Sequence, residues 1–153
     1  MNTLIYIAMI VVAVVIVSVI ATKARAAQGK SNEILDTRDA AYIRMHESVT
    51  AFEVNNEQVG VQSEMLKGMN APEYIVPAGK VDMVLSYESR GGVPGVVRVN
   101  NYTDKLPASF EVEKGKLYEV YFDKKENVFA IKQVEKMTWK TPLYKKFLEK
   151  YPR

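Results

Sequence analysis

The sequence predicts an α+β protein with a single N-terminal transmembrane helix, an amphipathic connecting helix, a small antiparallel β-barrel or sandwich of about five strands, and a short C-terminal helix. Two observations predict this class. The first 22 residues contain no charged side chain, although charged residues make up 25% of the chain. Apolar residues then recur at helical spacing from Ser31 and at a spacing of two from Lys80. We expect a transmembrane anchor at 1–22, a helical linker at 23–56, a β-domain at 57–135 and a basic amphipathic helix at 136–153.

The N-terminal segment has the length of a membrane anchor. Thr3 to Thr22 comprises 20 residues, and a helix of this length reaches ~30 Å, the thickness of the hydrocarbon core. Because the leading "MNT" is uncharged and the apolar run exceeds the core of roughly 7 to 15 residues found in signal peptides, we expect an uncleaved anchor. Cleavage at "ARA", residues 24–26, is the alternative.

The charges that flank this segment predict its orientation. Lys23, Arg25 and Lys30 follow the apolar run, and the first acidic residue is Glu33. Basic residues beside a span favour the cytoplasmic side, so the rule predicts an external N-terminus and a cytoplasmic domain. An extracytoplasmic domain is the alternative.

Next comes the segment expected to form the connecting helix. Ser31 can cap its N-terminus, and Glu33 places negative charge in the first turn. The polar "NNEQ" at residues 55–58 would end the helix. An apolar stripe at spacings near three, four and seven consists of Ile34, Ala41, Met45, Val49 and Phe52.

Beyond residue 80 the pattern becomes that of strands. In "KVDMVLSYES" the apolar residues alternate with polar ones from Val81 to Tyr87, as in a half-buried strand. "VVRVN", "ASFEVE", "LYEVYF" and "VFAIKQV" follow, separated by short polar turns without a helix. This order favours an antiparallel meander, and the strand count fits a small closed barrel or a sandwich equally well.

The loop between the first two of these strands is a candidate recognition loop. "RGGVPG" lacks the lysine and the strand–loop–helix setting of a phosphate-binding loop. A plain hairpin tip is the alternative. The residues concerned are Arg90, Gly91, Gly92 and Pro94.

The C-terminal helix combines basic and aromatic residues. Thr141 can cap it, with Pro142 in the first helical position. Residues 136–153 include six basic residues and one acidic residue, although the whole chain carries only +3. They could contact anionic lipid or a protein partner, or simply face water while the apolar side packs on the β-domain. The candidate contacts are Lys136, Trp139, Lys140, Lys145, Lys146, Lys150 and Arg153.

No motif of the sequence indicates catalysis. The chain has no cysteine and a single histidine, His46, without the ligand spacing of a metal site. No nucleic-acid-binding motif accompanies the basic tail. We therefore expect no catalytic residue, metal or cofactor, and a non-catalytic, single-pass membrane-anchored protein whose β-domain binds or scaffolds a protein partner, or a second copy, at the membrane surface.

The opening "TLIYIAMIVVA" resembles the N-terminal helix of type IV pilins and pseudopilins, which begins Thr-Leu-Ile-Glu and continues with a Met-Ile-Val-Val-Ala-like run. The resemblance covers about 20 residues, and Tyr6 stands where the family has its glutamate. It implies a membrane helix that continues into an amphipathic helix and an antiparallel β-domain. A filament subunit that assembles through the N-terminal helix is thus the alternative function.

Overall fold

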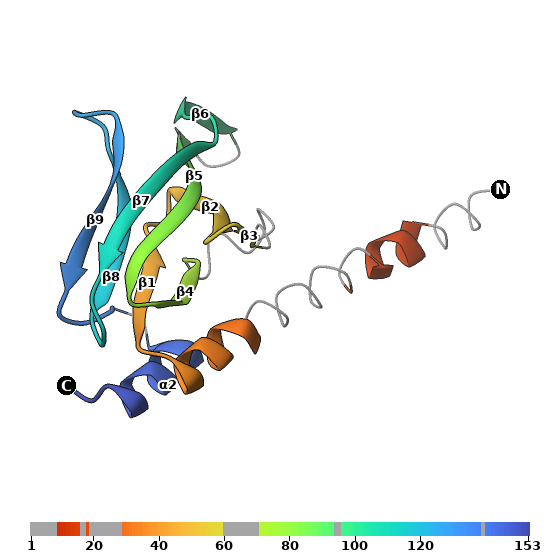
Figure 1. The fold of residues 1–153 in the computed structure, drawn as a ribbon. Helices are drawn as coiled ribbons and strands as arrows, with labels where there is room; N and C mark the ends of the chain where they lie inside the picture. Colours follow the sequence, from red (N-terminus) through yellow and green to blue (C-terminus); the bar gives the residue numbers. More distant parts are fainter. Residues whose placement is uncertain (1–8, 16–17, 19–28, 60–70, 94–95, 139) are drawn as a thin grey trace.

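The computed structural model describes residues 9–15, 18, 29–59, 71–93, 96–138 and 140–153. Among these, residues 9–15 and 29–37 are helical, strands occupy the middle of the chain, and helix α2 (Pro142–Lys150) follows the last strand (Figure 1). The α+β class and the C-terminal helix are confirmed.

The predicted anchor falls largely outside the described residues. Its part at 9–15 is helical, and the large apolar side chains there are more than half exposed. Within the described ranges, no helix has both the length and the apolar character needed to cross a membrane.

The strands form two sheets. The first has the order β4-β1-β8-β9, and the second has the order β3-β2-β5-β6 with β7 also paired to β5. The first sheet consists of β1 (Ala40–Met45), β4 (Glu73–Pro77), β8 (Leu117–Asp123) and β9 (Val128–Val134). The second consists of β2 (Val49–Val54), β3 (Glu57–Gln58), β5 (Gly79–Val93), β6 (Val96–Tyr102) and β7 (Leu106–Val112).

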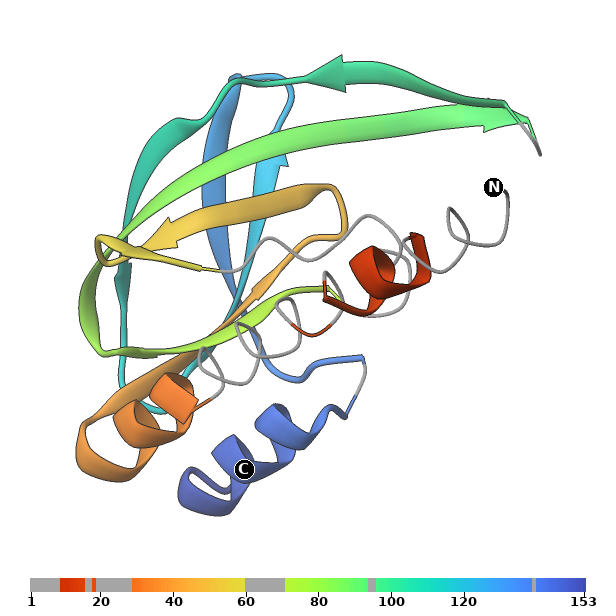
Figure 2. The ribbon, with the colours of Figure 1, turned by 90° about the vertical axis from the view of Figure 1, so that its right-hand side faces the viewer.

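The long strand β5 serves two parts of the second sheet. Residues 79–85 pair with β7 and residues 83–87 with β2, whereas residues 88–93 pair with β6. The β5–β6 hairpin therefore extends as an arm beyond the body of the sheet (Figure 2).

The sheets differ from the prediction in three ways. The strands do not close into one barrel, and nine strands, rather than about five, occur in the described part of the chain. One pairing is also not antiparallel, because β1 and β8 run parallel, with Tyr42 opposite Leu117. A meander of neighbouring strands could not produce this pairing.

The helical linker is confirmed only in part. Residues 29–37 are helical, but Ala40–Met45 and Val49–Val54 are strands β1 and β2. Strand β1 is buried on both faces, so its sequence "AAYIRM" shows no alternation of apolar and polar residues. The apolar residues of these two strands happen to recur at helical spacing, which is why the sequence predicts a helix there.

The polar "NNEQ" forms a tight hairpin between β2 and β3 instead of a helix end. Asn55 and Asn56 have φ values of 50° and 64°. Positive φ at both central residues is what a type I′ turn between antiparallel strands requires, and asparagine tolerates it. Asn55 also accepts a hydrogen bond from the Asp82 amide at 3.0 Å, which joins the turn to β5.

The core lies in two layers. One apolar cluster fills the space between the sheets and includes Ile43, Leu85 and Val120. A second cluster lies between the first sheet and the helices, and it includes Tyr42 and Phe147. Strand β1 contributes to both clusters because its side chains alternate between the two faces.

The β-domain has two distinct ends. At the helical end, residues 29–37 and α2 pack against the starts of β1 and β8. The distal end contains the β8–β9 turn and the middle of β5, where the Tyr87 and Phe122 rings stack 4.6 Å apart. Figure 1 shows the helices at the bottom and the β8–β9 turn at the top.

Candidate binding surfaces at the two ends of the β-domain

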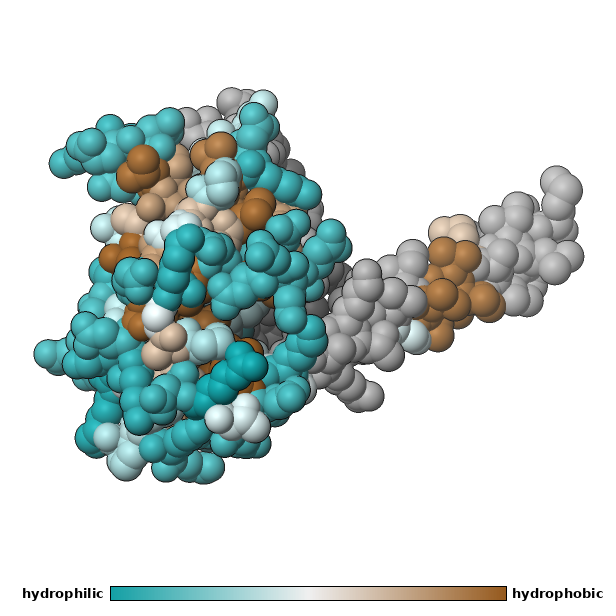
Figure 3. All heavy atoms as spheres, viewed as in Figure 1, coloured by the Kyte–Doolittle hydropathy of each residue, from teal (hydrophilic) through white to brown (hydrophobic). Residues whose placement is uncertain are grey.

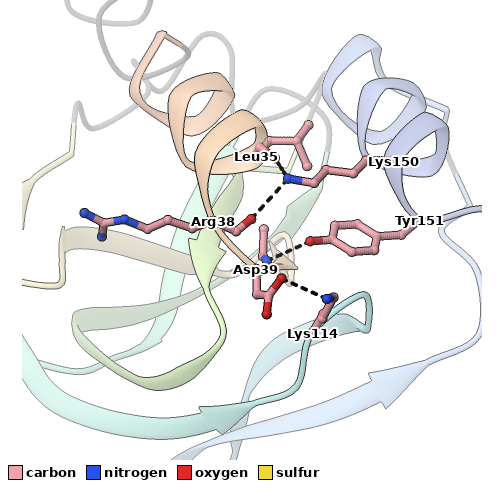
Figure 4. Close-up of polar contacts among 7 residues, drawn as sticks. Leu35, Arg38, Asp39, Lys114, Lys150 and Tyr151 are labelled. Atoms are coloured by element: carbon pink, nitrogen blue, oxygen red, sulfur yellow. Dashed lines mark hydrogen bonds and ion pairs between the residues drawn. The ribbon is translucent and has the colours of Figure 1, made fainter.

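Helix α2 fastens helix 29–37 to the domain. The Lys150 Nζ donates hydrogen bonds to the backbone carbonyls of Leu35 and Arg38, the latter at 3.2 Å (Figure 4). These carbonyls lie at the C-terminus of helix 29–37, where a cation also offsets the negative end of the helix dipole. Lys146 and Asp36 add an ion pair at 3.7 Å.

The chain directly after helix 29–37 is held as well. The Ala40 amide donates to the Tyr151 hydroxyl at 3.0 Å, and Lys114 pairs with Asp39 at 2.9 Å (Figure 4). Gly115 has a φ of +71°, and a Cβ there would lie 3.1 Å from the Tyr151 ring. The entry to β1 is thus fixed between α2 and the turn before β8.

A partly buried carboxylate lies beside the start of α2. Glu73 on β4 accepts hydrogen bonds from the hydroxyls of Tyr42 and Thr141, the latter at 2.8 Å. Thr141 in turn caps α2 by accepting a hydrogen bond from the Tyr144 amide at 3.1 Å. Burial raises the pKa of Glu73, and the hydrogen bond from Thr141 partly opposes that rise.

The structure divides the basic residues of the tail into two groups. Lys146 and Lys150 contact helix 29–37, and Arg153 donates to the carbonyls of Glu135 and Gly115 at 2.7 and 3.0 Å. Three others are exposed, and their side chains make no ion pair or hydrogen bond with the described residues: Lys136, Lys140 and Lys145. Trp139 lies outside the described residues. We name the exposed three the free lysines.

A groove of about 570 Å³ lies beside helix 29–37, between the β2–β3 hairpin and β4. Ile34, Val59 and Tyr74 supply apolar lining, and burial raises the pKa of Tyr74 to about 12. Lys30 and Glu57 on its rim pair at 2.7 Å. The positive charge of Lys30 and the negative charge of Glu57 therefore offset each other at the rim of the groove.

The distal end exposes apolar side chains. Tyr102 is 75% exposed at the end of β6, Leu106 is 37% exposed at the start of β7, and Val128 is 50% exposed at the start of β9. Register places Leu106 opposite Leu85 and Tyr102 opposite Glu88, so both lie beside the middle of β5. We call these three residues the distal patch. Figure 3 shows that hydrophobic residues are exposed among hydrophilic ones on the upper part of the β-domain.

Lysines lie over aromatic rings near this patch. The Lys105 Nζ lies 4.2 Å from the centre of the Phe52 ring, and the Lys124 Nζ lies 5.6 Å from that of Tyr87. Burial would raise the pKa of Tyr87, but hydrogen bonds with Lys124 and Ser89 outweigh it and lower the pKa. The distal end thus combines exposed apolar side chains with lysines beside them, an arrangement like the apolar centre and polar rim of a protein interface.

The predicted recognition loop lies on the β5–β6 arm. Arg90, Gly91 and Gly92 belong to strand β5, paired with Val99, Arg98 and Val97 of β6. Pro94 lies outside the described residues. The arm continues from the part of β5 that borders the distal patch, so the predicted loop and the patch share one end of the domain (Figure 2).

The distal patch was missed in the sequence, although a signal exists for part of it. Tyr102 and Leu106 stand at the two ends of the polar loop "TDK", residues 103–105. Large apolar residues beside an exposed polar loop can mark a contact surface. Val128 carried no comparable signal, because its place at the same end of the domain depends on how the sheets stack.

His46 lies directly after the last residue of strand β1, not on a helix. Its amide donates to the Val120 carbonyl at 2.8 Å. In the part of the chain that the structure describes, no three His, Asp or Glu side chains gather in a way that could hold a metal ion.

Comparison of the chain with protein-family models, with curated proteins and with solved structures found no match.

Proposed function

We propose that this chain is a non-catalytic, single-pass membrane-anchored protein whose β-domain binds a protein partner at the membrane surface. The observation that carries the proposal is the contrast between the ends of the domain. The helical end is fastened to the helix that follows the apolar N-terminal segment, and the distal end exposes apolar side chains.

The exposed apolar side chains of residues 9–15 support the membrane anchor. Their large apolar side chains are 55 to 63% exposed on a helix without a charged residue. Exposing apolar surface to water costs about 25 cal/mol per Å², and a lipid environment removes this cost. The run from Thr3 to Thr22 also has the length to span a bilayer.

The exposed side chains of the distal patch support a surface that binds a partner. Tyrosine is enriched at protein interfaces because it buries a large apolar ring and keeps a hydrogen-bonding hydroxyl. Tyr102 presents such a ring to solvent, and Leu106 and Val128 add apolar area. Lys105 and Lys124, held over aromatic rings, would form a polar rim.

Membrane attachment is tested by fractionation of cells that express the full chain. We expect the protein to stay in the membrane fraction after an alkaline carbonate wash. Val12→Lys with Val15→Glu should release it, because charges in the middle of a span oppose insertion. Gln58→Lys with Gln133→Glu, the same charges placed at exposed sites of the β-domain, should not. Release of the unmodified chain by the wash would refute the anchor.

Partner binding is tested with a photo-crosslinking residue at position 102. We expect one discrete crosslinked species, which disappears in Leu106→Asp with Val128→Asp. The matched control, Gln58→Asp with Gln133→Asp, should leave the species unchanged, since both glutamines are exposed away from the patch. Equal crosslinking in both variants would argue against the distal patch.

Sidedness is tested by single cysteines at Ser89 and Lys125 in this cysteine-free chain. Labelling with a membrane-impermeant thiol reagent only after lysis supports a cytoplasmic domain. Labelling of intact cells supports an external domain and favours the alternative, a pilin-like filament subunit. Electron microscopy of the cell surface then tests that alternative directly, because such a subunit should form filaments.

A further inference from the structure

We propose that the start of α2 contacts anionic lipid headgroups through the free lysines Lys136, Lys140 and Lys145, and thereby fixes how the β-domain lies on the membrane. The inference rests on the proposed membrane anchor. It goes further because it assigns a second contact with the membrane, made by the other end of the chain.

The basic residues of the tail fall into two groups of three. Lys146, Lys150 and Arg153 already make contacts within the molecule, which hold α2 and helix 29–37 together. Lys136, Lys140 and Lys145 are exposed, and the described residues give them no such contact. These three are therefore available for a contact outside the molecule.

Two of the free lysines lie at the start of α2. Thr141 is the N-cap, so Lys140 and Lys145 flank the first turn, and that turn contains no acidic residue. The N-terminus of a helix carries partial positive charge, so cations there oppose the stability of the helix. Lys150, in the last turn, has the favourable placement. Helix stability therefore does not account for Lys140 and Lys145.

The relative direction of α2 and helix 29–37 places the start of α2. Lys146 pairs with Asp36, and Lys150 reaches Leu35 and Arg38, so α2 and helix 29–37 run side by side in the same sense (Figures 1 and 2). The start of α2 therefore lies toward the start of helix 29–37, where Lys30 lies. This is also the side from which an N-terminal anchor would join the domain.

The positive charge of the free lysines is complementary to an anionic membrane surface. An anionic bilayer attracts basic residues within a Debye length of its surface. Each lysine near such a surface strengthens the contact roughly fivefold. Because the anchor already holds the domain there, the gain appears as a higher fraction of molecules in one orientation.

Trp139 provides the test. It is the only tryptophan of the chain and directly precedes Lys140 in the sequence. The full chain is placed in nanodiscs of phosphatidylcholine, with or without phosphatidylglycerol, that carry a quencher on the headgroup. We expect at least twofold stronger quenching of Trp139 with the anionic lipid, and loss of the difference at high salt.

The matched variants separate a local contact from a general charge effect. Lys140→Gln with Lys145→Gln should abolish the difference between the two lipids. Lys124→Gln with Lys125→Gln, the same loss of charge at the distal end, should preserve it. Circular dichroism should show that both variants keep their helix content.

Two results would overturn the proposal in different ways. Equal quenching in both lipids, with the chain incorporated in the discs, refutes the headgroup contact and leaves the anchor intact. Failure of the chain to enter the discs refutes the anchor itself and the inference with it.

Discussion

The helical end and the distal end of the β-domain differ in where their side chains find partners. At the helical end, Tyr42, Lys150 and Tyr151 all bond within the molecule, and Phe147 is fully buried. At the distal end, Tyr102 and Val128 are at least half exposed. The difference teaches that the polar and aromatic side chains of the helical end are used within the molecule, whereas several large side chains of the distal end stay exposed.

The largest expected effect comes from removing the central ring of the helical end. Phe147 packs between Tyr42 and Tyr151, with ring centres 5.6 and 4.9 Å away. Phe147→Ala should lower stability by about 3–5 kcal/mol, because it leaves a cavity in a fully buried site. Hydrogen exchange should show faster opening of α2 and of residues 29–37 than of β5. Uniform acceleration across the domain would mean that the two ends do not differ in this way.

A smaller effect is expected at the cap of α2. Thr141→Ala removes the acceptor for the Tyr144 amide and the hydroxyl that bonds Glu73. The loss should be about 0.5–2 kcal/mol, as for other N-caps. Urea unfolding measures it, and Thr141→Ser should restore most of the stability. Failure of serine to do so would assign the effect to the lost methyl group.

The partly buried carboxylate of Glu73 should make stability depend on pH. Because the pKa of Glu73 is raised in the folded state, folding favours its protonated form. The stabilisation that protonated Glu73 adds to the folded state is fully present below the ordinary glutamate pKa of about 4.5. It is lost as the pH rises through the raised pKa of Glu73 in the folded state. Relative to Glu73→Gln, the unmodified chain should therefore lose stability as the pH rises above that ordinary value. Urea unfolding of both at several pH values tests this, and parallel pH profiles would contradict it.

The smallest effect on stability is expected at the distal end. Tyr102→Ala should change the free energy of unfolding by less than about 0.5 kcal/mol, since the side chain is largely exposed. The same variant should weaken binding of the proposed partner, measured with the photo-crosslinking residue at position 106 instead of 102. A loss of stability as large as that of Thr141→Ala would mean that Tyr102 supports the fold and would remove the contrast between the ends.

Sequence patterns predicted the elements whose signals are local. Thr141-Pro142 marked the start of α2, and alternation from Val81 to Tyr87 marked β5. The same reasoning failed for β1, because a strand covered on both faces has no polar alternation. Its place between β4 and β8 depends on pairings between distant residues, which no local window contains.

The candidate surfaces were predicted unevenly for a similar reason. Charge alone singled out Lys136, Lys140 and Lys145, together with Lys146, Lys150 and Arg153. Only the contacts with helix 29–37, and the carbonyls bound by Arg153, separate one group from the other. The distal patch gathers residues from β6, β7 and β9, so it exists only once the sheets are stacked.

The parallel pairing of β1 with β8 also has a consequence for the order of folding during synthesis. Tyr42 and Leu117, which face each other across this pairing, are 75 positions apart in the chain. At roughly 5–20 residues per second, the ribosome needs several seconds to supply β8 after β1 has been made. The first sheet cannot be completed in that interval, and α2 emerges later still. A chain inserted early through its N-terminus would thus wait, tethered and only partly folded, until its last residues are released.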